Sequence, residues 1–201
     1  MNQDKSHMLT SKVSLDEVTK KLSESFDYNF SGESSFEVPN IKIPDTYSTG
    51  LIVGQSGSGK SSILQQIGKS EKHYWSKDKA VCSHFKNADD AQEKFAAVGF
   101  NSVPSWFKPY QVLSTGEKFR VDLARSLKNG AVVDEFTSVV DRNVAKSCSN
   151  AVSSYIKRKK LKNVVFASCH YDIIDWLNPD WVYDTSTKNL TYRRSDRRPD
   201  I

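Results

Sequence analysis

The chain has 201 residues, enough for one domain with a substantial core, and its 37% hydrophobic and 26% charged content is typical of a soluble globular protein. No apolar run is long enough to cross a bilayer, and the N-terminal residues lack the apolar core of a signal peptide, so a cytoplasmic location is expected (the host cytoplasm if the protein is virally encoded). The net charge of +5 comes partly from basic clusters at 157–162 and 193–198. Each cluster alone is explained by a solvated helix end or a frayed tail, and together they are a weak indication of a polyanionic partner.

The first part of the chain predicts little regular structure. Residues 1–25 form a polar segment in which 1–13 are expected to be disordered. The sequence Ser14-Leu15-Asp16-Glu17 resembles a capping box ahead of a short helix that reaches about Glu24. Residues 26–44 alternate apolar side chains with Gly, Pro and Asn, which predicts short antiparallel strands.

From residue 51 onward, strands alternate with helices. We expect strands at 51–53, 79–83, 131–133 and 164–167, and a closing hairpin at 181–183 and 190–192. Helices are expected at 59–66, 89–98, 113–130, 143–159 and 173–177. This order predicts an α/β fold with a mostly parallel central sheet, a small antiparallel N-terminal β part and a reduced helical insertion at about 84–112.

The segment after the first buried strand contains the P-loop pattern Gly-x-x-x-x-Gly-Lys-Ser, followed by a helix. Glycines let such a loop wrap a phosphate chain with its backbone N–H groups turned inward. Lys60 is expected to reach the outer phosphates, and the Ser61 hydroxyl to bind Mg²⁺. The predicted ATP-binding residues of the loop are Gly54, Gln55, Ser56, Gly57, Ser58, Gly59, Lys60, Ser61 and Ser62.

Acidic and imidazole side chains follow two further strands. Asp134 and Glu135 come directly after 131–133, where Asp134 is expected to bind Mg²⁺ and Glu135 to orient or deprotonate the attacking water. His170 follows 164–167 and is expected to hydrogen-bond the terminal phosphate. Cys169 is expected to be a small buried residue, and the three cysteines of the chain do not indicate a disulfide framework.

A second anion-binding helix start is predicted at Leu113-Ser114-Thr115-Gly116-Glu117, where a hydroxyl cap and a glycine leave a row of backbone N–H groups. In this order, the motifs resemble those of the ATP-binding-cassette (ABC) ATPase family over residues 26–193, with 194–201 as a basic tail. Gly54–Ser61 resembles the Walker A loop, 132–135 Walker B, 113–117 the signature motif, 138–141 the D-loop and His170 the switch histidine.

The resemblance implies that Ser114, Thr115, Gly116 and Glu117 contact ATP bound to Lys60 of a second copy. It therefore implies a homodimer with two ATP molecules and Mg²⁺ at the interface, linked by Asp141, and an ATPase that acts as a dimerising switch. Catalytic roles fall to Glu135, His170 and Lys60.

Two family features are not found in the sequence. No loop glutamine is evident, since Gln92 lies in a predicted helix and His84 or Lys86 lies nearer the expected strand end. The adenine-stacking aromatic is also open among Tyr28, Phe30 and Phe36, of which Tyr28 is our choice. The short insertion argues against a transport role and a membrane partner, because in transporters this region grips the membrane subunits.

The chain most resembles the ATPase half of proteins that join such a domain to an acetyltransferase, and small standalone versions carried by bacteriophages. This resemblance and the basic clusters favour a DNA-related process, with DNA and an acetyltransferase as candidate partners. Two alternatives stay open. They are a transporter nucleotide-binding subunit and a nucleotide-dependent docking module with negligible turnover, the latter suggested by Thr115 and Glu117, where the family usually has Gly and Gln.

Overall fold

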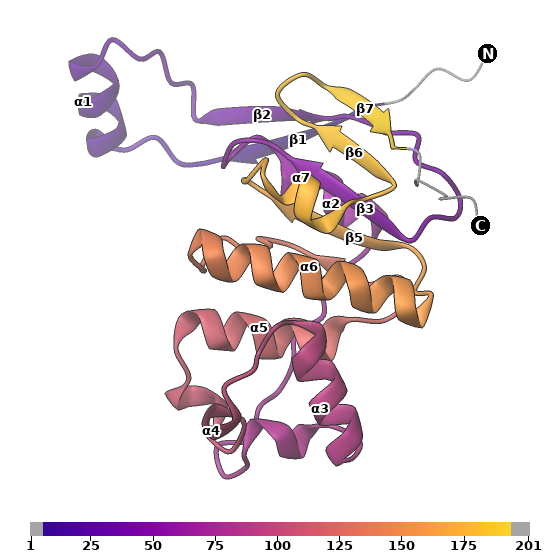
Figure 1. Ribbon diagram of the computed structural model, residues 1–201. Coiled ribbons are helices and arrows are strands. Elements are labelled where there is room, and N and C mark those ends of the chain that lie inside the picture. Colours follow the sequence, from indigo (N-terminus) through magenta and orange to yellow (C-terminus); the bar gives the residue numbers. More distant parts are fainter. Residues whose placement is uncertain (1–5, 194–201) are drawn as a thin grey trace. The chain divides into compact units, whose positions relative to one another are not determined.

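The computed structural model describes residues 6–193 and divides the chain into an N-terminal unit, up to Lys42, and a larger unit from Ile43 onward (Figure 1). The predicted basic tail, at 194–201, lies outside the described residues. Arg193 belongs to the folded part, because its backbone N–H donates to Asp180 O at 2.8 Å and its Nη1 donates to Ile174 O at 2.8 Å.

The N-terminal unit is a two-stranded antiparallel ribbon with a helix between its strands. Strand β1 (His7–Lys12) pairs with β2 (Glu33–Val38), and α1 (Glu17–Ser25) lies between them in the sequence. The prediction of disorder for 1–13 is therefore wrong over 7–12, and the strands predicted within 26–44 are one strand. Every side chain of β1 is exposed, so no apolar alternation marks it as a strand.

Helix α1 begins two residues later than a cap at Ser14 would place it. The N-cap is Asp16, whose Oδ1 accepts from Thr19 N at 2.8 Å, while Thr19 Oγ1 accepts from Asp16 N at 2.9 Å. These hydrogen bonds to Thr19 also lower the pKa of the Asp16 carboxyl. No residue of the helix is buried.

The larger unit is built on a mostly parallel sheet, as predicted. Its strands are β3 (Thr49–Val53), β4 (Val132–Val133), β5 (Val164–Ser168), β6 (Trp181–Asp184) and β7 (Asn189–Tyr192), in the spatial order β4-β5-β3-β6-β7. The first four are parallel to one another, and β7 closes the predicted antiparallel hairpin with β6. The register pairs Val53 with both Ser168 and Asp184, so the segments that follow these strands emerge at one edge of the sheet.

Helices pack around this sheet and extend away from it (Figure 1). Helix α2 (Lys60–Ile67) follows the P-loop, and α6 (Arg142–Lys159) and α7 (Ile173–Leu177) follow β4 and β5. The remaining elements are η1 (Val81–His84), α3 (Ala88–Ala97), α4 (Val103–Trp106), η2 (Tyr110–Val112) and α5 (Thr115–Ser126). The strand predicted at 79–83 is wrong, because this segment forms the 3₁₀ helix η1 and its Val81 N–H donates to Lys108 O at 2.9 Å.

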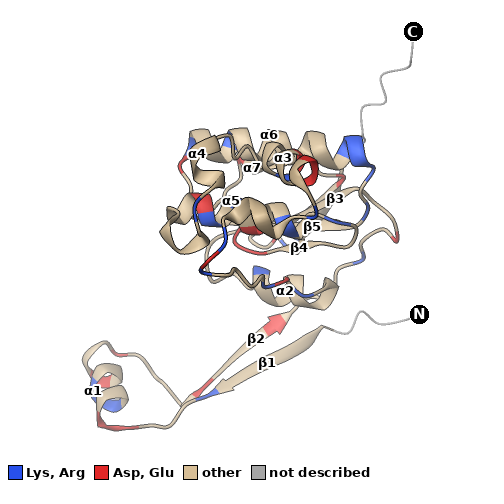
Figure 2. Ribbon diagram, turned by 90° about the horizontal axis from the view of Figure 1, so that it is seen from below, with Lys and Arg blue, Asp and Glu red and all other residues tan. Residues whose placement is uncertain are grey.

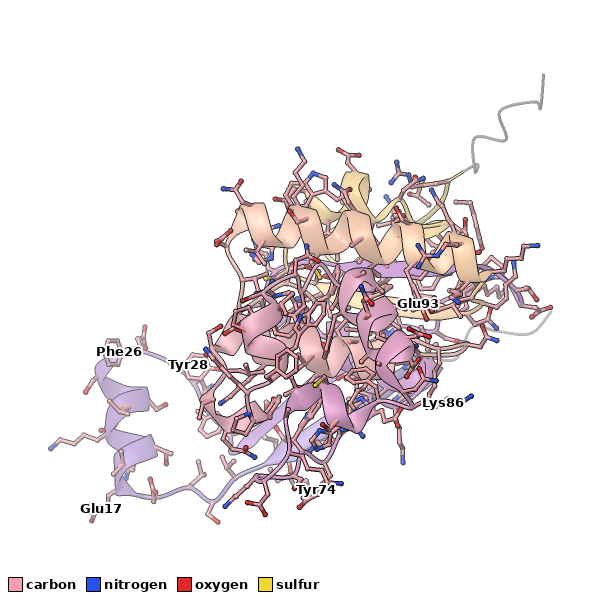
Figure 3. The ribbon with its side chains drawn as sticks, turned by 60° about the horizontal axis from the view of Figure 1, so that its bottom comes forward. Glu17, Phe26, Tyr28, Tyr74, Lys86 and Glu93 are labelled. Carbon is pink, nitrogen blue, oxygen red and sulfur yellow. The ribbon has the colours of Figure 1, made fainter. Side chains whose placement is uncertain are left out.

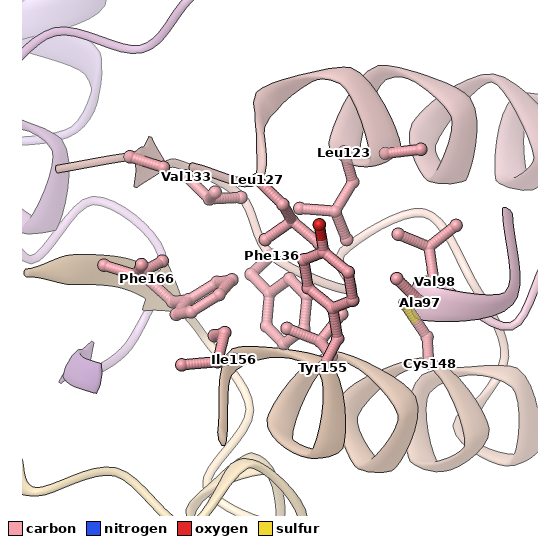
Figure 4. Packing of buried hydrophobic residues seen from close by; sticks show 14 of the residues in the cluster. Ala97, Val98, Leu123, Leu127, Val133, Phe136, Cys148, Tyr155, Ile156 and Phe166 are labelled. Carbon is pink, nitrogen blue, oxygen red and sulfur yellow. The ribbon is translucent and has the colours of Figure 1, made fainter. Parts of the chain in front are cut away.

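The hydrophobic core joins α5 and α6 to the sheet (Figure 4). Phe136, fully buried, lies between Phe119 of α5, at a ring distance of 6.0 Å, and Phe166 of β5, at 4.7 Å. Cys148 of α6 is packed in the same core, and its burial raises the pKa of the thiol to about 12. These contacts fix the turn after β4 relative to α5.

A ring stack and two hydrogen bonds to Asp122 connect the residues around the helical insertion to α5. The Trp75 and Tyr110 rings stack at 5.1 Å with 5° between their planes. Asp122 of α5 accepts from Trp75 Nε1 and from Tyr110 OH, each at 2.7 Å. Burial and these contacts with Asp122 raise the pKa of Tyr110. One carboxylate thus binds both the segment that precedes the insertion, at Trp75, and the end of the insertion, at Tyr110, to the helix that begins at Thr115.

Candidate functional site: a phosphate-binding edge of the sheet

The P-loop joins β3 to α2 and has the backbone conformation that its glycines permit. Gly54, Gly57 and Gly59 have φ values of 155°, 78° and 89°, in the region that L side chains rarely adopt. Gly59 is the N-cap of α2 and makes no side-chain cap, so the first N–H groups of this helix have no intrahelical partner. The loop therefore presents backbone donors and the positive end of a helix.

Lys60 is buried in the loop. Only 8% of its surface is exposed, and its Nζ donates to Gly54 O at 2.8 Å and to Gln55 O at 2.6 Å. The loop is closed further by Ser58 N, which donates to Gln55 O at 3.1 Å. The ammonium group is thus held within the loop, where an anion bound by the backbone N–H groups would meet it.

Ser61 and Asp134 line one cavity, of about 550 Å³, between α2 and β4. Its other lining residues are Leu64, Gln65, Gly68, Lys69, Ser70 and Val132. A hydroxyl and a carboxylate are the oxygen donors that Mg²⁺ prefers. The two residues predicted to bind the metal are therefore brought to the same cavity by elements far apart in the sequence.

The turn after β4 points Glu135 outward and Phe136 inward. Glu135 is exposed with φ 52°, and its N–H donates to Asp134 Oδ1 at 2.8 Å. Phe136 N donates to Ala167 O at 2.8 Å, which continues the pairing with β5 past the end of β4. Thr137, fully buried with φ 65°, completes the turn. Asp134 and Glu135 therefore stand at the edge of the sheet where the P-loop lies.

His170 follows β5 at the same edge. Its Nδ1 lies 3.4 Å from Thr137 Oγ1, and its N–H donates to Ser168 Oγ at 3.1 Å. Burial of the ring lowers the pKa of His170 below its usual 6.5, and the charge of Arg142 lowers it further, while Asp172 opposes the shift. The neutral imidazole is thus the favoured form near pH 7. Arg142 is paired with Asp172, with its Nε donating to Asp172 Oδ2 at 3.0 Å.

The predicted signature residues form the first turn of α5. Ser114 Oγ accepts from Glu117 N at 3.2 Å, and Glu117 Oε1 accepts from Ser114 N at 3.1 Å, a complete capping box. Hydrogen bonding from Ser105, the largest cause, lowers the pKa of Glu117, so its carboxylate is ionised near pH 7. A methyl group at Gly116 would lie 3.2 Å from Val140 Cγ1, so this glycine lies close to the segment that precedes Asp141.

Asp141 is the N-cap of α6, where its Oδ1 accepts from Val144 N at 2.9 Å. This contact is local to the start of α6, so a link between two protomers through Asp141 stays a prediction. Ser114 and Thr115 are exposed, and the described residues of the same chain place no phosphate-binding loop against them. Whether a second protomer does so also stays a prediction.

Tyr28, our choice for adenine stacking, lies in the N-terminal unit. It is 66% exposed and lines an apolar cavity of about 350 Å³ with Thr19, Leu22, Ser23, Phe26 and Phe30 (Figure 3). Its assignment stays a prediction.

His84, one of the residues near the expected position of the loop glutamine, makes hydrogen bonds within its own segment. Its Nε2 accepts from Ser76 N at 3.0 Å, and its Nδ1 lies 3.0 Å from Ala80 O, which requires the proton on Nδ1.

Sequence reasoning missed Thr185, which touches the P-loop. A methyl group at Gly54 would lie 1.7 Å from Thr185 Oγ1, so these two residues are in close contact. The rule that singled out His170, a polar residue just after a parallel strand, would also have singled out Thr185. The sequence at 181–192 indicates only the antiparallel hairpin, and the parallel pairing of β6 with β3 is visible in the structure alone.

Comparisons with known proteins agree with this geometry at the level of the fold. No protein-family model matches the chain, and no curated protein matches it either. Among solved structures, it is similar to a dimeric bacterial ABC transporter cassette, MJ0796, with 12% identity, a TM-score of 0.57, and coverage of 81% of this chain and 93% of that one. The chain thus has the α/β fold of ABC ATP-binding cassettes.

Two further structures support the same fold. One is a dimeric post-hydrolysis state of MJ0796 bound to ADP and Pi, with 12% identity, a TM-score of 0.60, and coverage of 92% of this chain and 97% of that one. The other is an inward-facing ABC transporter of the metal-chelate type, with 18% identity, a TM-score of 0.52, and coverage of 80% and 76%. Among the described residues, no helix is long and apolar enough to span a membrane.

Proposed function

We propose that this protein binds and hydrolyses ATP, and that ATP drives its dimerisation. The observation that carries the proposal is the meeting of the P-loop, the Asp134–Glu135 turn and His170 at one edge of the sheet, after β3, β4 and β5. In a fold shared with ABC cassettes, these are the groups that phosphoryl transfer to water needs: a phosphate cradle, oxygen ligands for a cation, and a base.

Each residue has a defined task in this proposal. The P-loop N–H groups and Lys60 bind the β- and γ-phosphates. Ser61 and Asp134 would hold Mg²⁺, which supplies charge neutralisation for the phosphates. Glu135, exposed at the edge of the sheet, orients and deprotonates the attacking water. His170, favoured in its neutral form, donates a hydrogen bond to the γ-phosphate.

Dimerisation is proposed because the signature helix start is accessible in the single chain. Ser114 and Thr115 are exposed, and the backbone N–H groups of Thr115 and Gly116, at the start of α5, have no carbonyl one turn earlier to bond. A γ-phosphate bound to a second copy would satisfy them. Two structures of the similar cassette MJ0796 are dimers, and one of them holds ADP and Pi. ATP would then favour the dimer by mass action.

The test is the variant Glu135→Gln, which keeps the size and hydrogen-bonding capacity of the side chain but removes the base. We expect ATP binding to be retained, phosphate release to fall by at least about 100-fold, and a dimer to accumulate with ATP in light scattering. Glu37→Gln, on β2 of the N-terminal unit, is the matched control. Wild-type protein that releases no phosphate would favour the docking module with negligible turnover, and an E135Q variant that stays monomeric with ATP would overturn the dimer.

A DNA-related process is proposed on the distribution of positive charge. The last turn of α6 carries Lys157, Arg158 and Lys159 (Figure 2), and Lys160 and Lys162 follow. Gly130 N donates to Lys162 O at 2.9 Å, which brings Lys128 to the same end of the sheet. Glu93 and Glu71 pair with part of this surface.

The measurement is duplex DNA binding as a function of salt. Lys160→Glu with Lys162→Glu is expected to weaken binding and to flatten its salt dependence. Lys20→Glu with Lys21→Glu, on α1, is the matched control for net charge. Absence of binding at low salt would refute a direct DNA contact. Capture of a membrane protein with the E135Q variant would instead support the transporter subunit, and capture of an acetyltransferase would identify that proposed partner.

A further inference from the structure

The turn that joins β6 to β7 contacts both the P-loop and the loop that carries His170. Strand β6 pairs in parallel with β3, with Asp184 opposite Val53. The next residues, Thr185 and Gly54, are therefore neighbours. On the other side of β3, the register places Ser168, two residues before His170, opposite the same Val53. The turn at 184–186 is thus near both loops that the proposed reaction uses.

Thr185 makes three contacts with the P-loop side. Its backbone N–H donates to Val53 O at 2.9 Å, and its Oγ1 lies 3.2 Å from Val53 O and 2.7 Å from Ser58 Oγ. A hydroxyl carries one proton, so if Thr185 donates to Val53 O, Ser58 donates to Thr185. In either arrangement, the Ser58 side chain is held against the turn, and with it the middle of the phosphate-binding loop.

Asp184 and Ser186 make the contacts on the His170 side. Tyr171 OH donates to Asp184 Oδ1 at 2.9 Å and lies 3.2 Å from Ser186 Oγ. The same Asp184 oxygen accepts from Ser186 N at 2.8 Å, which fixes the carboxylate in the turn. Because Tyr171 is the residue next to His170, this carboxylate anchors the histidine loop.

We propose that the 184–186 turn is a positioning element of the nucleotide site. Thr185 sets the P-loop through Ser58, and Asp184 sets the His170 loop through Tyr171. The γ-phosphate has to be reached from both loops at once, and a turn bonded to both fixes their separation before ATP arrives, which is how preorganised groups speed a reaction. This inference rests on the proposed ATPase function, but its structural half can be tested without ATP.

The first test is kinetic. Thr185→Val keeps the shape of the side chain and removes only the hydroxyl. We expect it to raise the KM for ATP by about three- to tenfold with kcat changed by less than about twofold, the loss expected for one uncharged hydrogen bond. Ser58→Ala should have the same effect, and the double variant should be no worse than either single one. Tyr171→Phe should do the reverse and lower kcat while leaving KM unchanged.

The second test is amide hydrogen exchange of the nucleotide-free protein. Ser58 N donates to Gln55 O at 3.1 Å, so its exchange reports the closed loop. Thr185→Val should accelerate exchange over 54–59, whereas Thr191→Val, exposed on β7, should change neither exchange nor kinetics. Unchanged exchange in T185V, or additive effects of T185V and S58A, would overturn the inference. Failure of the wild type to bind or hydrolyse ATP would refute the proposed function and leave the exchange result to decide the role of Thr185.

Discussion

Two helices of the larger unit begin in ways that suit an anion, and they differ in what their first turns already bind. Helix α2 starts at Gly59, whose left-handed conformation provides no side-chain cap, so its first amides are left for a ligand. Helix α5 starts with a complete capping box between Ser114 and Glu117. The first is an open helix end with a buried lysine in the loop before it, and the second is a finished helix end at the surface.

This difference suits the two helix starts to different proposed roles: nucleotide binding within one chain at α2, and contact with the nucleotide of a second protomer at α5. In the proposed function, a phosphate chain at α2 would replace water on donors that have no partner in the fold, so the P-loop would bind nucleotide within one chain. At α5, the capping box has already satisfied the amide of Glu117, and only those of Thr115 and Gly116 are left. An anion there adds to a helix that is stable without it, as expected of a site that a second protomer uses only when ATP is bound.

The largest expected effect comes from removing the cation of the open site. Lys60→Ala takes away the ammonium group that Gly54 O and Gln55 O hold, and we expect ATP hydrolysis to fall by at least about 100-fold and ATP binding to be lost. Titration with a fluorescent ATP analogue and phosphate release measure both. Lys146→Ala, exposed on α6, should match the wild type. If K60A bound ATP as tightly as the wild type, the start of α2 would not be the nucleotide-binding helix start proposed here.

Two substitutions of Ser114 distinguish its role as a helix cap from its proposed contact with the phosphate of a second protomer. Ser114→Ala removes the cap and should lower the free energy of unfolding by about 1 kcal/mol. Ser114→Asp keeps a good cap but adds a negative charge where the γ-phosphate of a partner would lie. We expect S114D to be as stable as the wild type and to bind ATP, yet to form no ATP-dependent dimer in light scattering. An S114D dimer as tight as that of the wild type would place the phosphate elsewhere.

A smaller effect is expected at Glu117. Its carboxylate is ionised and lies in the same turn that would meet the partner's phosphates, so it opposes their approach. Glu117→Gln retains the capping box, because glutamine also serves at this position. The ATP-dependent dimer should therefore become tighter, by up to about tenfold, without a change in thermal stability. Weaker dimerisation of E117Q would show instead that the carboxylate contributes to the interface.

The smallest effect concerns the pH dependence of hydrolysis. Burial and then Arg142 lower the pKa of His170, so the ring stays neutral to a lower pH than an ordinary imidazole, and the acidic fall in activity should be displaced to lower pH accordingly. Arg142→Gln removes the positive charge, which raises the pKa of His170 and should move the acidic fall of kcat to higher pH. Arg158→Gln, on the same helix but paired with Glu93, is the control. An unchanged profile in R142Q would mean that another group sets the acidic limb.

The strand, glycine-rich loop and helix at 49–67 were predictable because glycine spacing, a lysine and a preceding apolar run are all local in the sequence. The strand β1 was not, because its exposed residues pair with a segment that starts at Glu33, beyond a whole helix. Short runs such as 79–83 were misread since three or four apolar residues suit a strand and a buried 3₁₀ turn equally well. The contact of Thr185 with the P-loop could not be predicted, because it depends on the parallel pairing of β6 with β3, which no local sequence pattern indicates.

The turn after β4 stores conformational strain beside the proposed base. Glu135 and Thr137 both adopt a left-handed backbone conformation, which a side chain resists at about 1 kcal/mol or more each, the more so for a β-branched threonine. Glu135→Gly would relieve part of this strain, so this variant, which lacks the proposed base, should unfold at a higher temperature than the wild type. Selection for thermostability alone would therefore favour replacement of Glu135 by glycine, whereas selection for ATP turnover would favour the carboxylate.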